Sequence, residues 1–173
     1  MRTFQLYPEE RHFWSFNDYG AVLDVMELRL PKRILEFGPG SSTLALIEGG
    51  AETIDACEDD PHYFATYQRR LAAAYPSIVS MQAYRWSDPL RVPQLDGRWY
   101  DLALIDGPRE TPNRAAAIEY CLQRCAAVLI PLEEHPGHQY LRPVAVELAK
   151  RHGRSVEIIE DTGPLAGAFA LLT

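Results

Sequence analysis

The sequence is poor in positive charge. Its 173 residues include 17 Lys and Arg against 24 Asp and Glu, a formal net charge of −7 at pH 7. Because nucleic-acid binding needs a basic surface, no nucleic-acid partner is expected. The basic residues of the second half, Arg109, Arg114, Arg142 and those at 150–154, are interpreted as solvated helix faces rather than as a patch at one edge.

Long apolar runs are also lacking. No stretch approaches the length that spans a membrane, and the residues from Met1 to Gln5 contain no secretory apolar core. Neither a membrane partner nor secretion is expected. The cysteines, Cys57, Cys121 and Cys125, are odd in number and stand among apolar residues, so we expect reduced core thiols in a cytoplasmic protein. Cys121 and Cys125 are spaced i, i+4 on an expected helix without further ligands nearby, so no metal site is expected.

The length favours one folding unit with a buried core, and no repeat, low-complexity tract or linker interrupts it. We divide the chain into an N-terminal segment with a helix, 1–31, and an α/β domain, 32–173. The helix is expected to begin at a capping box, with Ser15 as N-cap and Asp18 three residues later, and to end before Pro31. Residues 1–20 are rich in aromatic side chains. They would cover the site as a lid, pack on the sheet edge, or pack on a second subunit.

Short apolar runs alternate with helix patterns over residues 32–173, which predicts a doubly wound α/β fold. The expected strands are 33–37, 53–58, 77–82, 100–106, 126–131, 155–160 and 166–172, and the expected helices begin near 42, 61, 111 and 138–142. Only residues 161–165 join the last two strands. So short a connection makes an antiparallel hairpin, because a parallel pair needs a crossover. We therefore expect a three-layer fold with a mostly parallel seven-stranded sheet and an antiparallel C-terminal strand.

The most informative segment runs Glu36-Phe37-Gly38-Pro39-Gly40-Ser41-Ser42-Thr43. A strand ends in an acid, turns through two glycines and enters a helix that opens with hydroxyl residues. Gly38 and Gly40 carry no Cβ, so the turn is able to lie close to a ligand. The carboxylate of Glu36 suits a ligand with an ammonium group or hydroxyls and repels a pyrophosphate.

This segment resembles the first motif of class I S-adenosylmethionine-dependent methyltransferases, roughly acid-x-Gly-x-Gly-x. Pro39 departs from the usual pattern. The rival dinucleotide fingerprint requires a third glycine where Thr43 stands. The terminal hairpin also resembles the methyltransferase layout, and the resemblance covers residues 32–173. It implies S-adenosylmethionine as cofactor, held by residues 36–43, and the strand order 3-2-1-4-5-7-6.

Polar residues follow the next two strands. Glu58 stands eighteen positions after Gly40, near the offset of an acid that accepts hydrogen bonds from both ribose hydroxyls of either NAD or S-adenosylmethionine. Alternatively, Glu58 and Asp59 only favour the N-terminus of the next helix. Trp86-Ser87-Asp88 falls where methyltransferases hold the adenine, and here the alternative is a tryptophan that pins a long loop onto the core.

Asp106-Gly107-Pro108-Arg109, after the fourth strand, resembles the fourth methyltransferase motif. Asp106 would contact the methionine ammonium, orient the acceptor or act as general base, and Gly107 would border the cofactor. Arg109 is a second catalytic candidate. After the fifth strand, the loop 132–138 holds Glu133, Glu134, His135 and His138, of which His135 or His138 would act as base. In some relatives, an acid at this place and the acid after the fourth strand hold a divalent cation, and Asp106 with Glu133, Glu134 and His135 would be the equivalent here. A solvated acidic loop is the simpler interpretation, and no metal is assigned.

The sequence therefore predicts a small cytoplasmic S-adenosylmethionine-dependent methyltransferase. No Asn/Asp-Pro-Pro-Tyr signature is present, which weakens the case for amino-group methylation of DNA bases or glutamine. The acceptor is unassigned and expected to be a small molecule. Two alternatives stay open at this point: an NAD-binding oxidoreductase domain, and a methyltransferase-fold binding protein without turnover.

Overall fold

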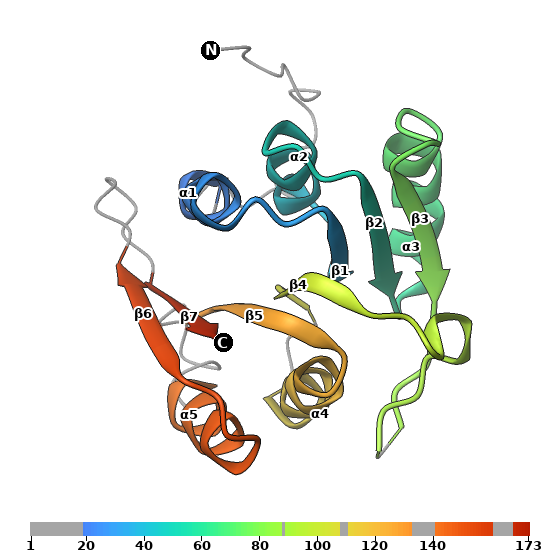
Figure 1. The fold of residues 1–173 in the computed structure, drawn as a ribbon. Coiled ribbons are helices and arrows are strands. Elements are labelled where there is room, and N and C mark those ends of the chain that lie inside the picture. The colour runs from blue at the N-terminus through green and yellow to red at the C-terminus, as the bar shows by residue number, and fades with distance from the viewer. Residues whose placement is uncertain (1–18, 88, 108–110, 133–140, 161–167) are drawn as a thin grey trace.

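The computed structural model describes residues 19–87, 89–107, 111–132, 141–160 and 168–173. Within these ranges seven strands form one sheet in the order β3-β2-β1-β4-β5-β7-β6 (Figure 1). The strands are β1 (Arg33–Phe37), β2 (Thr53–Glu58), β3 (Val79–Ala83), β4 (Tyr100–Ile105), β5 (Cys125–Pro131), β6 (Val156–Glu160) and β7 (Ala168–Leu172). The first five in spatial order are parallel, whereas β7 is antiparallel to both β5 and β6. The expected order and terminal antiparallel pair are confirmed.

Helices cover both faces of the sheet (Figure 1). They are α1 (Tyr19–Arg29), α2 (Ser41–Glu48), α3 (Pro61–Tyr67), α4 (Thr111–Leu122) and α5 (Leu141–Arg151). The first three pack on one face with a core that includes Met26, Leu46 and Leu71. The other two pack on the opposite face with a core that includes Ile118 and Leu148. These two apolar layers bury the sheet on both sides, as a parallel sheet requires.

Helix α3 begins at a capped turn, in which Asp60 precedes Pro61. Asp60 is the N-cap, and its Oδ1 accepts hydrogen bonds from the backbone N–H groups of His62 at 2.7 Å and Tyr63 at 3.2 Å. Pro61 stands at the first helical position, where its missing N–H is not needed. The helix then continues as a π-helical turn over Gln68–Ala72. At α1, the expected capping box at Ser15 lies outside the described residues, and the helix ends at Arg29 before Pro31.

The three cysteines are free and buried, as expected. The placement of Cys125 on the same helix as Cys121 was wrong, however. Helix α4 ends at Leu122, and Cys125 is the first residue of β5, where it pairs with Tyr100 of β4. An i, i+4 spacing of apolar residues does not show whether a helix continues or ends between them. Here the pairing of Cys125 with β4 places it in a strand.

The described part of the connection from β3 to β4 contains no α-helix. Leu90, Val92 and Leu95 of this loop are buried in the core beside α4, and a short 3₁₀ turn spans Pro93–Leu95.

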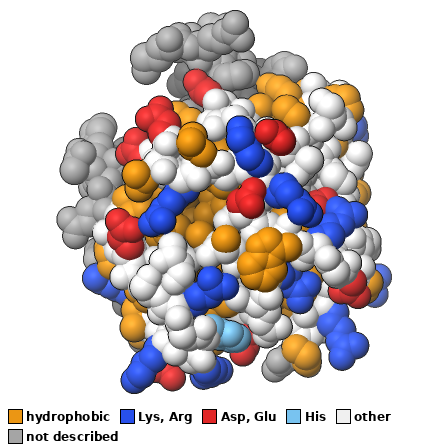
Figure 2. All heavy atoms as spheres, in the orientation of Figure 1, with side chains coloured by type: hydrophobic (Ala, Val, Ile, Leu, Met, Phe, Trp, Pro, Cys, Tyr) orange, Lys and Arg blue, Asp and Glu red, His pale blue; other side chains and the backbone are white. Residues whose placement is uncertain are grey.

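The space-filling view shows acidic and basic side chains interspersed on the face that it presents (Figure 2). None of the helices in the described ranges has the length and apolar character needed to cross a membrane.

Candidate functional site

The carboxyl ends of the parallel strands form the candidate site. Strand β1 lies between β2 and β4. After β1 the chain forms β2 and β3 on one side of β1, and it then crosses to form β4 on the other side. This is the topological switch point, where open α/β sheets bind ligands. The sequence-predicted residues that follow β1, β2, β3 and β4 are thereby brought to one edge.

The turns after β1 and β4 touch backbone to backbone. The N–H groups of Asp106 and Gly107 both donate to the carbonyl of Phe37, at 2.9 and 2.8 Å. Gly38 has φ +81°, and a Cβ built there would lie 2.5 Å from the nitrogen of Gly107. Gly38 is thus required by the neighbouring backbone rather than by direct approach of a ligand. This contact between two distant glycines was not foreseen from the sequence.

Gly40 differs from Gly38. A Cβ added at Gly40 would meet no atom of the described residues within 4 Å, so that part of the chain leaves space beside this backbone. Gly40 is also the N-cap of α2, and its N–H donates to Thr43 Oγ1 at 2.9 Å. The clearance that the sequence predicts for a ligand therefore lies at the second glycine of the turn.

Glu36 is fully buried beneath this turn. Its two carboxyl oxygens accept hydrogen bonds from Ser42 Oγ at 2.6 Å and Thr43 Oγ1 at 2.7 Å. The pKa of Glu36 is raised to about 8, chiefly by burial; the Ser42 and Thr43 hydroxyl donors lower it, and the charge of Asp106 contributes to the increase. Glu36 thus ties the first turn of α2 to the end of β1, and its direct contact with a ligand stays a prediction.

Glu58 ends β2 and is 9% exposed. Its Oε1 accepts hydrogen bonds from the N–H groups of Asp59 at 3.1 Å and Asp60 at 3.0 Å. Among the described residues, no donor is recorded for its other oxygen, Oε2. The pKa of Glu58 is raised to about 7, chiefly by burial; the two backbone N–H donors lower it, and the charges of Asp59 and Asp60 contribute to the increase. The alternative that Glu58 and Asp59 favour the next helix applies in part, but the helix cap itself is Asp60.

Trp86 is fixed from two sides. Its Nε1 donates to Asp59 Oδ2 at 2.5 Å, and its ring packs edge-on against Tyr84 with centroids 4.9 Å apart. Tyr84 in turn packs edge-on against Phe37 at the end of β1. These contacts support the interpretation that Trp86 anchors the loop. They also join the ends of β1, β2 and β3 through one aromatic chain.

Ser87 is exposed and holds its own loop. Its hydroxyl donates to the carbonyl of Pro89 at 2.9 Å and accepts from the N–H of Arg91 at 3.2 Å. Trp86 and Ser87 also line a cavity of about 710 Å³. The cavity extends along α4 and α5, where Ala116 and Leu148 are among its apolar walls.

Arg114 is the main residue that the sequence analysis misplaced. It stands in the first turn of α4, is 3% exposed, and donates a hydrogen bond from its guanidinium to the carbonyl oxygen of Asp106. The expectation of a solvated helix face was wrong. Its spacing to Ile118 and Cys121, i+4 and i+7, puts Arg114 on the buried stripe of the helix, and this signal is readable in the sequence.

Several predicted site residues lie outside the described residues. These are Asp88, Pro108, Arg109, Glu133, Glu134, His135 and His138. Within the described part of the chain, no group of three or more His, Cys, Asp or Glu side chains is arranged to hold a metal ion.

The opposite edge of the sheet holds a second polar cavity, of about 360 Å³, lined by the amino ends of β1, β2 and β3. Asp55 lies at its wall, and its Oδ2 accepts hydrogen bonds from Arg98 at 2.7 Å and Tyr100 at 2.8 Å. This network raises the pKa of Arg98, first through the hydrogen bond and then through the charge of Asp55. It satisfies the buried carboxylate of Asp55 in β2.

Comparison with solved structures gives strong matches. An O-methyltransferase from Bacillus cereus in complex with SAH superposes with a TM-score of 0.72 at 17% identity, covering 92% of this chain and 81% of that one. The O-methyltransferase TomG from Streptomyces achromogenes, in complex with SAM, gives 0.71 at 22% identity, with coverage of 94% and 84%. Magnesium protoporphyrin IX methyltransferase from Synechocystis, with bound SAM, gives 0.65 at 14% identity, with coverage of 89% and 77%.

The fold is that of the class I S-adenosylmethionine-dependent methyltransferases. No protein-family model matches the sequence, and comparison with curated proteins finds no relative. The methyltransferase fold therefore rests on structural similarity, on the strand order and on the glycine turn.

Proposed function

We propose that this protein is an S-adenosylmethionine-dependent methyltransferase that acts on a small-molecule acceptor. The observation that carries the proposal is the open space beside Gly40, at the switch point and next to buried carboxyl groups. A ligand able to use this place needs positive charge or hydroxyl groups close to the backbone. S-adenosylmethionine has an ammonium, a sulfonium and two ribose hydroxyls.

The electrostatics favour this cofactor over a dinucleotide. Glu36 and Glu58 are both buried with raised pKa values, and Asp106 adds charge close to Glu36. A cation near such groups stabilises their ionised forms, whereas a pyrophosphate would be repelled. Thr43 stands where the dinucleotide fingerprint requires glycine, and its hydroxyl is already bonded to Glu36. Solved structures with this fold that contain SAM or SAH support the same choice.

The side chains at the strand ends would divide the work of binding. Glu58 would accept from the ribose hydroxyls, since its Oε1 is already oriented by two backbone N–H groups. Trp86 would present a ring to the adenine while Asp59 holds its indole N–H. Asp106 would contact the ammonium group or the acceptor. When bound, the cofactor supplies an electrophilic methyl group, and the protein's contribution is mainly orientation and proximity.

Fewer residues are proposed to bind the methyl acceptor than to bind the cofactor. Asp106 is proposed as the group that orients the acceptor or takes its proton, because it ends β4 beside the glycine turn. Arg109 and His135 are proposed as further catalytic residues from their positions after β4 and β5. A cytoplasmic location and a homodimer contact through residues 1–20 are kept as proposals.

A thermal-shift screen with S-adenosylmethionine, S-adenosylhomocysteine, NAD and NADP tests the proposal. A ligand at a hundred times its dissociation constant stabilises the folded protein by roughly 2.7 kcal/mol, which is a shift of several degrees. We expect stabilisation by the two sulfur compounds and none by the nicotinamide cofactors. Stabilisation by NAD alone would reverse the assignment in favour of an oxidoreductase domain.

A further inference from the structure

Arg114 occupies an unusual place for a cation. Arginine side chains are mostly exposed in folded proteins, whereas Arg114 is 3% exposed. It also stands in the first turn of α4, where the helix dipole disfavours positive charge. Two unfavourable terms therefore act on this side chain. Its contacts at the candidate site must offset both.

The guanidinium reaches back from α4 to the turn that follows β4. It donates to the carbonyl oxygen of Asp106, the residue proposed to face the acceptor. The N–H of Gly107, which belongs to the same peptide group as this carbonyl, donates to the carbonyl of Phe37. The peptide group between Asp106 and Gly107 is thus held on one side by α4 and on the other by the end of β1.

The contact between Gly38 and Gly107 limits how far the turn after β4 can move. The backbone of Gly107 lies against Gly38, so that a Cβ at Gly107 would be 3.0 Å from the Cα of Gly38. A small displacement of the turn after β4 would press on the glycine turn, including the opening beside Gly40. The position of the Asp106 turn and the shape of the cofactor site are therefore coupled.

We propose that Arg114 is a positioning residue that holds the Asp106–Gly107 turn against the glycine turn, so that the cofactor site is formed before the ligand arrives. This role rests on the proposed function. It assigns to Arg114 an effect on cofactor affinity that acts through Asp106 and Gly107 rather than through contact with the cofactor. The five N–H donors of arginine, arranged in a rigid fork, suit this task better than the single ammonium of lysine.

Arg154 offers a matched control. Its guanidinium also donates to backbone carbonyls, those of Leu122, Cys125 and Ala126, but at the opposite edge of the sheet. Arg154→Met removes the same kind of bond without touching the candidate site. It corrects for the general loss of stability that follows removal of an arginine that bonds the backbone.

The test compares Arg114→Met, Arg114→Lys and Arg154→Met by two measurements: amide hydrogen exchange at Asp106 and Gly107, and the Kd of S-adenosylhomocysteine. In Arg114→Met we expect the two amides to exchange about tenfold faster and the Kd to rise about tenfold, with Arg114→Lys in between. Arg154→Met should lower the melting temperature but leave both quantities near their wild-type values. If Arg114→Met does not fold, Arg114→Lys carries the comparison.

Unchanged exchange at Asp106 and Gly107 would overturn the proposal, as would faster exchange with a wild-type Kd. If the wild-type protein does not bind S-adenosylhomocysteine at all, the proposed function fails. The exchange measurement then decides by itself whether Arg114 holds the turn. The two failures are therefore distinguishable.

Discussion

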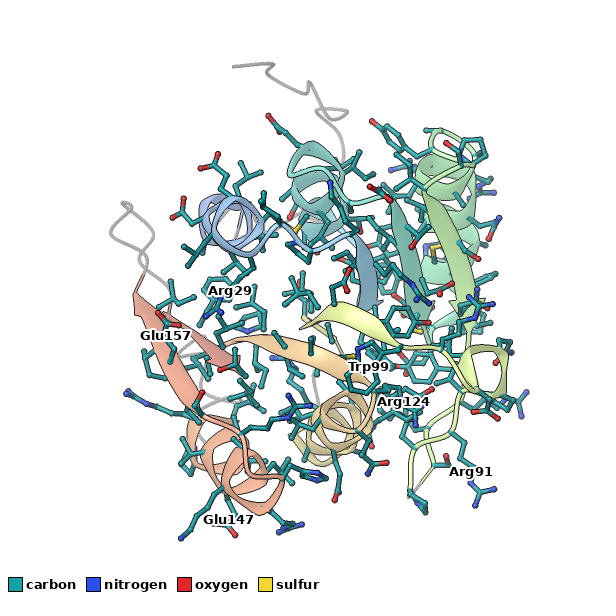
Figure 3. All side chains as sticks on the ribbon, in the orientation of Figure 1. Arg29, Arg91, Trp99, Arg124, Glu147 and Glu157 are labelled. Carbon is teal, nitrogen blue, oxygen red and sulfur yellow. The ribbon has the colours of Figure 1, made fainter. Side chains whose placement is uncertain are left out.

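At the amino edge of the sheet, Glu52 pairs with Lys32 and Asp55 with Arg98, whereas at the carboxyl edge Glu36 and Glu58 are held by N–H and O–H groups. Asp101 at the amino edge is the exception, because it accepts hydrogen bonds from the backbone N–H groups of Lys32 and Arg33. A further ion pair joins Arg29 of α1 to Glu157 of β6 at 3.4 Å, and Figure 3 labels both residues. The carboxyl edge instead combines two buried, raised-pKa acids with backbone that is open to a ligand.

The two edges differ in what the carboxyl groups have as partners. The exposed pair of Glu52 and Lys32 contributes little to stability, whereas Arg98 pairs with the buried carboxylate of Asp55. At the carboxyl edge the pKa values of Glu36 and Glu58 are raised, so a cation bound there would favour the ionised forms of both groups.

The largest expected effect comes from the contact between the two turns. Gly38→Ala places a Cβ against the backbone of Gly107 and strains a residue with φ +81°. We expect a loss of about 3 kcal/mol or more in the free energy of unfolding, measured by urea titration. Gly97→Ala, also at positive φ but with no atom near the added Cβ, separates steric contact from backbone strain. Equal losses in the two variants would show that the contact between the turns is unimportant.

The pH dependence of stability should follow the buried acids. Burial holds the pKa of Glu36 at about 8 in the folded protein, against 4.5 without burial. Since the folded state binds this proton more tightly, the stabilisation is fully present below pH 4.5 and is lost as the pH rises to about 8. We expect the free energy of unfolding to fall by on the order of a few kcal/mol over this interval, partly through Glu58.

Glu36→Gln provides the comparison, because glutamine keeps hydrogen bonding but does not ionise. Its stability should depend less on pH between 4.5 and 8 than that of the wild-type protein. Identical slopes for the two proteins would mean that Glu36 is not a buried acid with a raised pKa.

Asp106→Asn tests the proposed catalytic role. Asparagine keeps the size of the side chain and much of its hydrogen bonding while removing the charge. We expect near-native melting and, once an acceptor is found, turnover reduced by roughly 10²-fold if Asp106 acts as base. Weaker cofactor binding is the measurement that is accessible before then. Full activity would move the chemistry to Arg109 or to the loop 133–138.

Glu58→Ala should have the smallest effect of the series. Removal of a charged acceptor from two hydroxyls should weaken S-adenosylhomocysteine binding by roughly 1–3 kcal/mol, measured by titration calorimetry. Glu52→Ala, an exposed acid before the amino end of β2, is the control and should bind normally. Normal binding by a folded Glu58→Ala protein would show that Glu58 serves only to bond the backbone N–H groups of Asp59 and Asp60.

The sequence predicts the strands and their order well, because each depends on local patterns. The apolar runs, the acids at the ends of β1 and β2, and the Asp60-Pro61 helix start are all local signals. The short connection before β7 also determines the antiparallel pair. These elements, together with the first motif, are enough to predict the fold.

The contacts that shape the site depend instead on residues far apart in the chain. The need for glycine at position 38 depends on Gly107, which is brought near only by the pairing of β1 with β4. The bond from Arg114 to Asp106 depends on the angle at which α4 returns over the sheet. The direction of the Trp86 indole N–H likewise depends on Asp59. Such geometry follows from tertiary packing and cannot be obtained from spacing along the sequence.

The central claim is that the open space beside Gly40 receives the cofactor. The most direct measurement is the affinity of S-adenosylhomocysteine, by titration calorimetry, for the wild-type protein, Gly40→Leu and Gly20→Leu. In the described part of the chain, neither glycine has an atom within 4 Å of an added Cβ, but Gly20 is exposed in α1 and does not belong to the turn after β1. The account predicts binding by the wild-type and Gly20→Leu proteins and loss of measurable binding in a folded Gly40→Leu protein. Wild-type affinity in Gly40→Leu would contradict it.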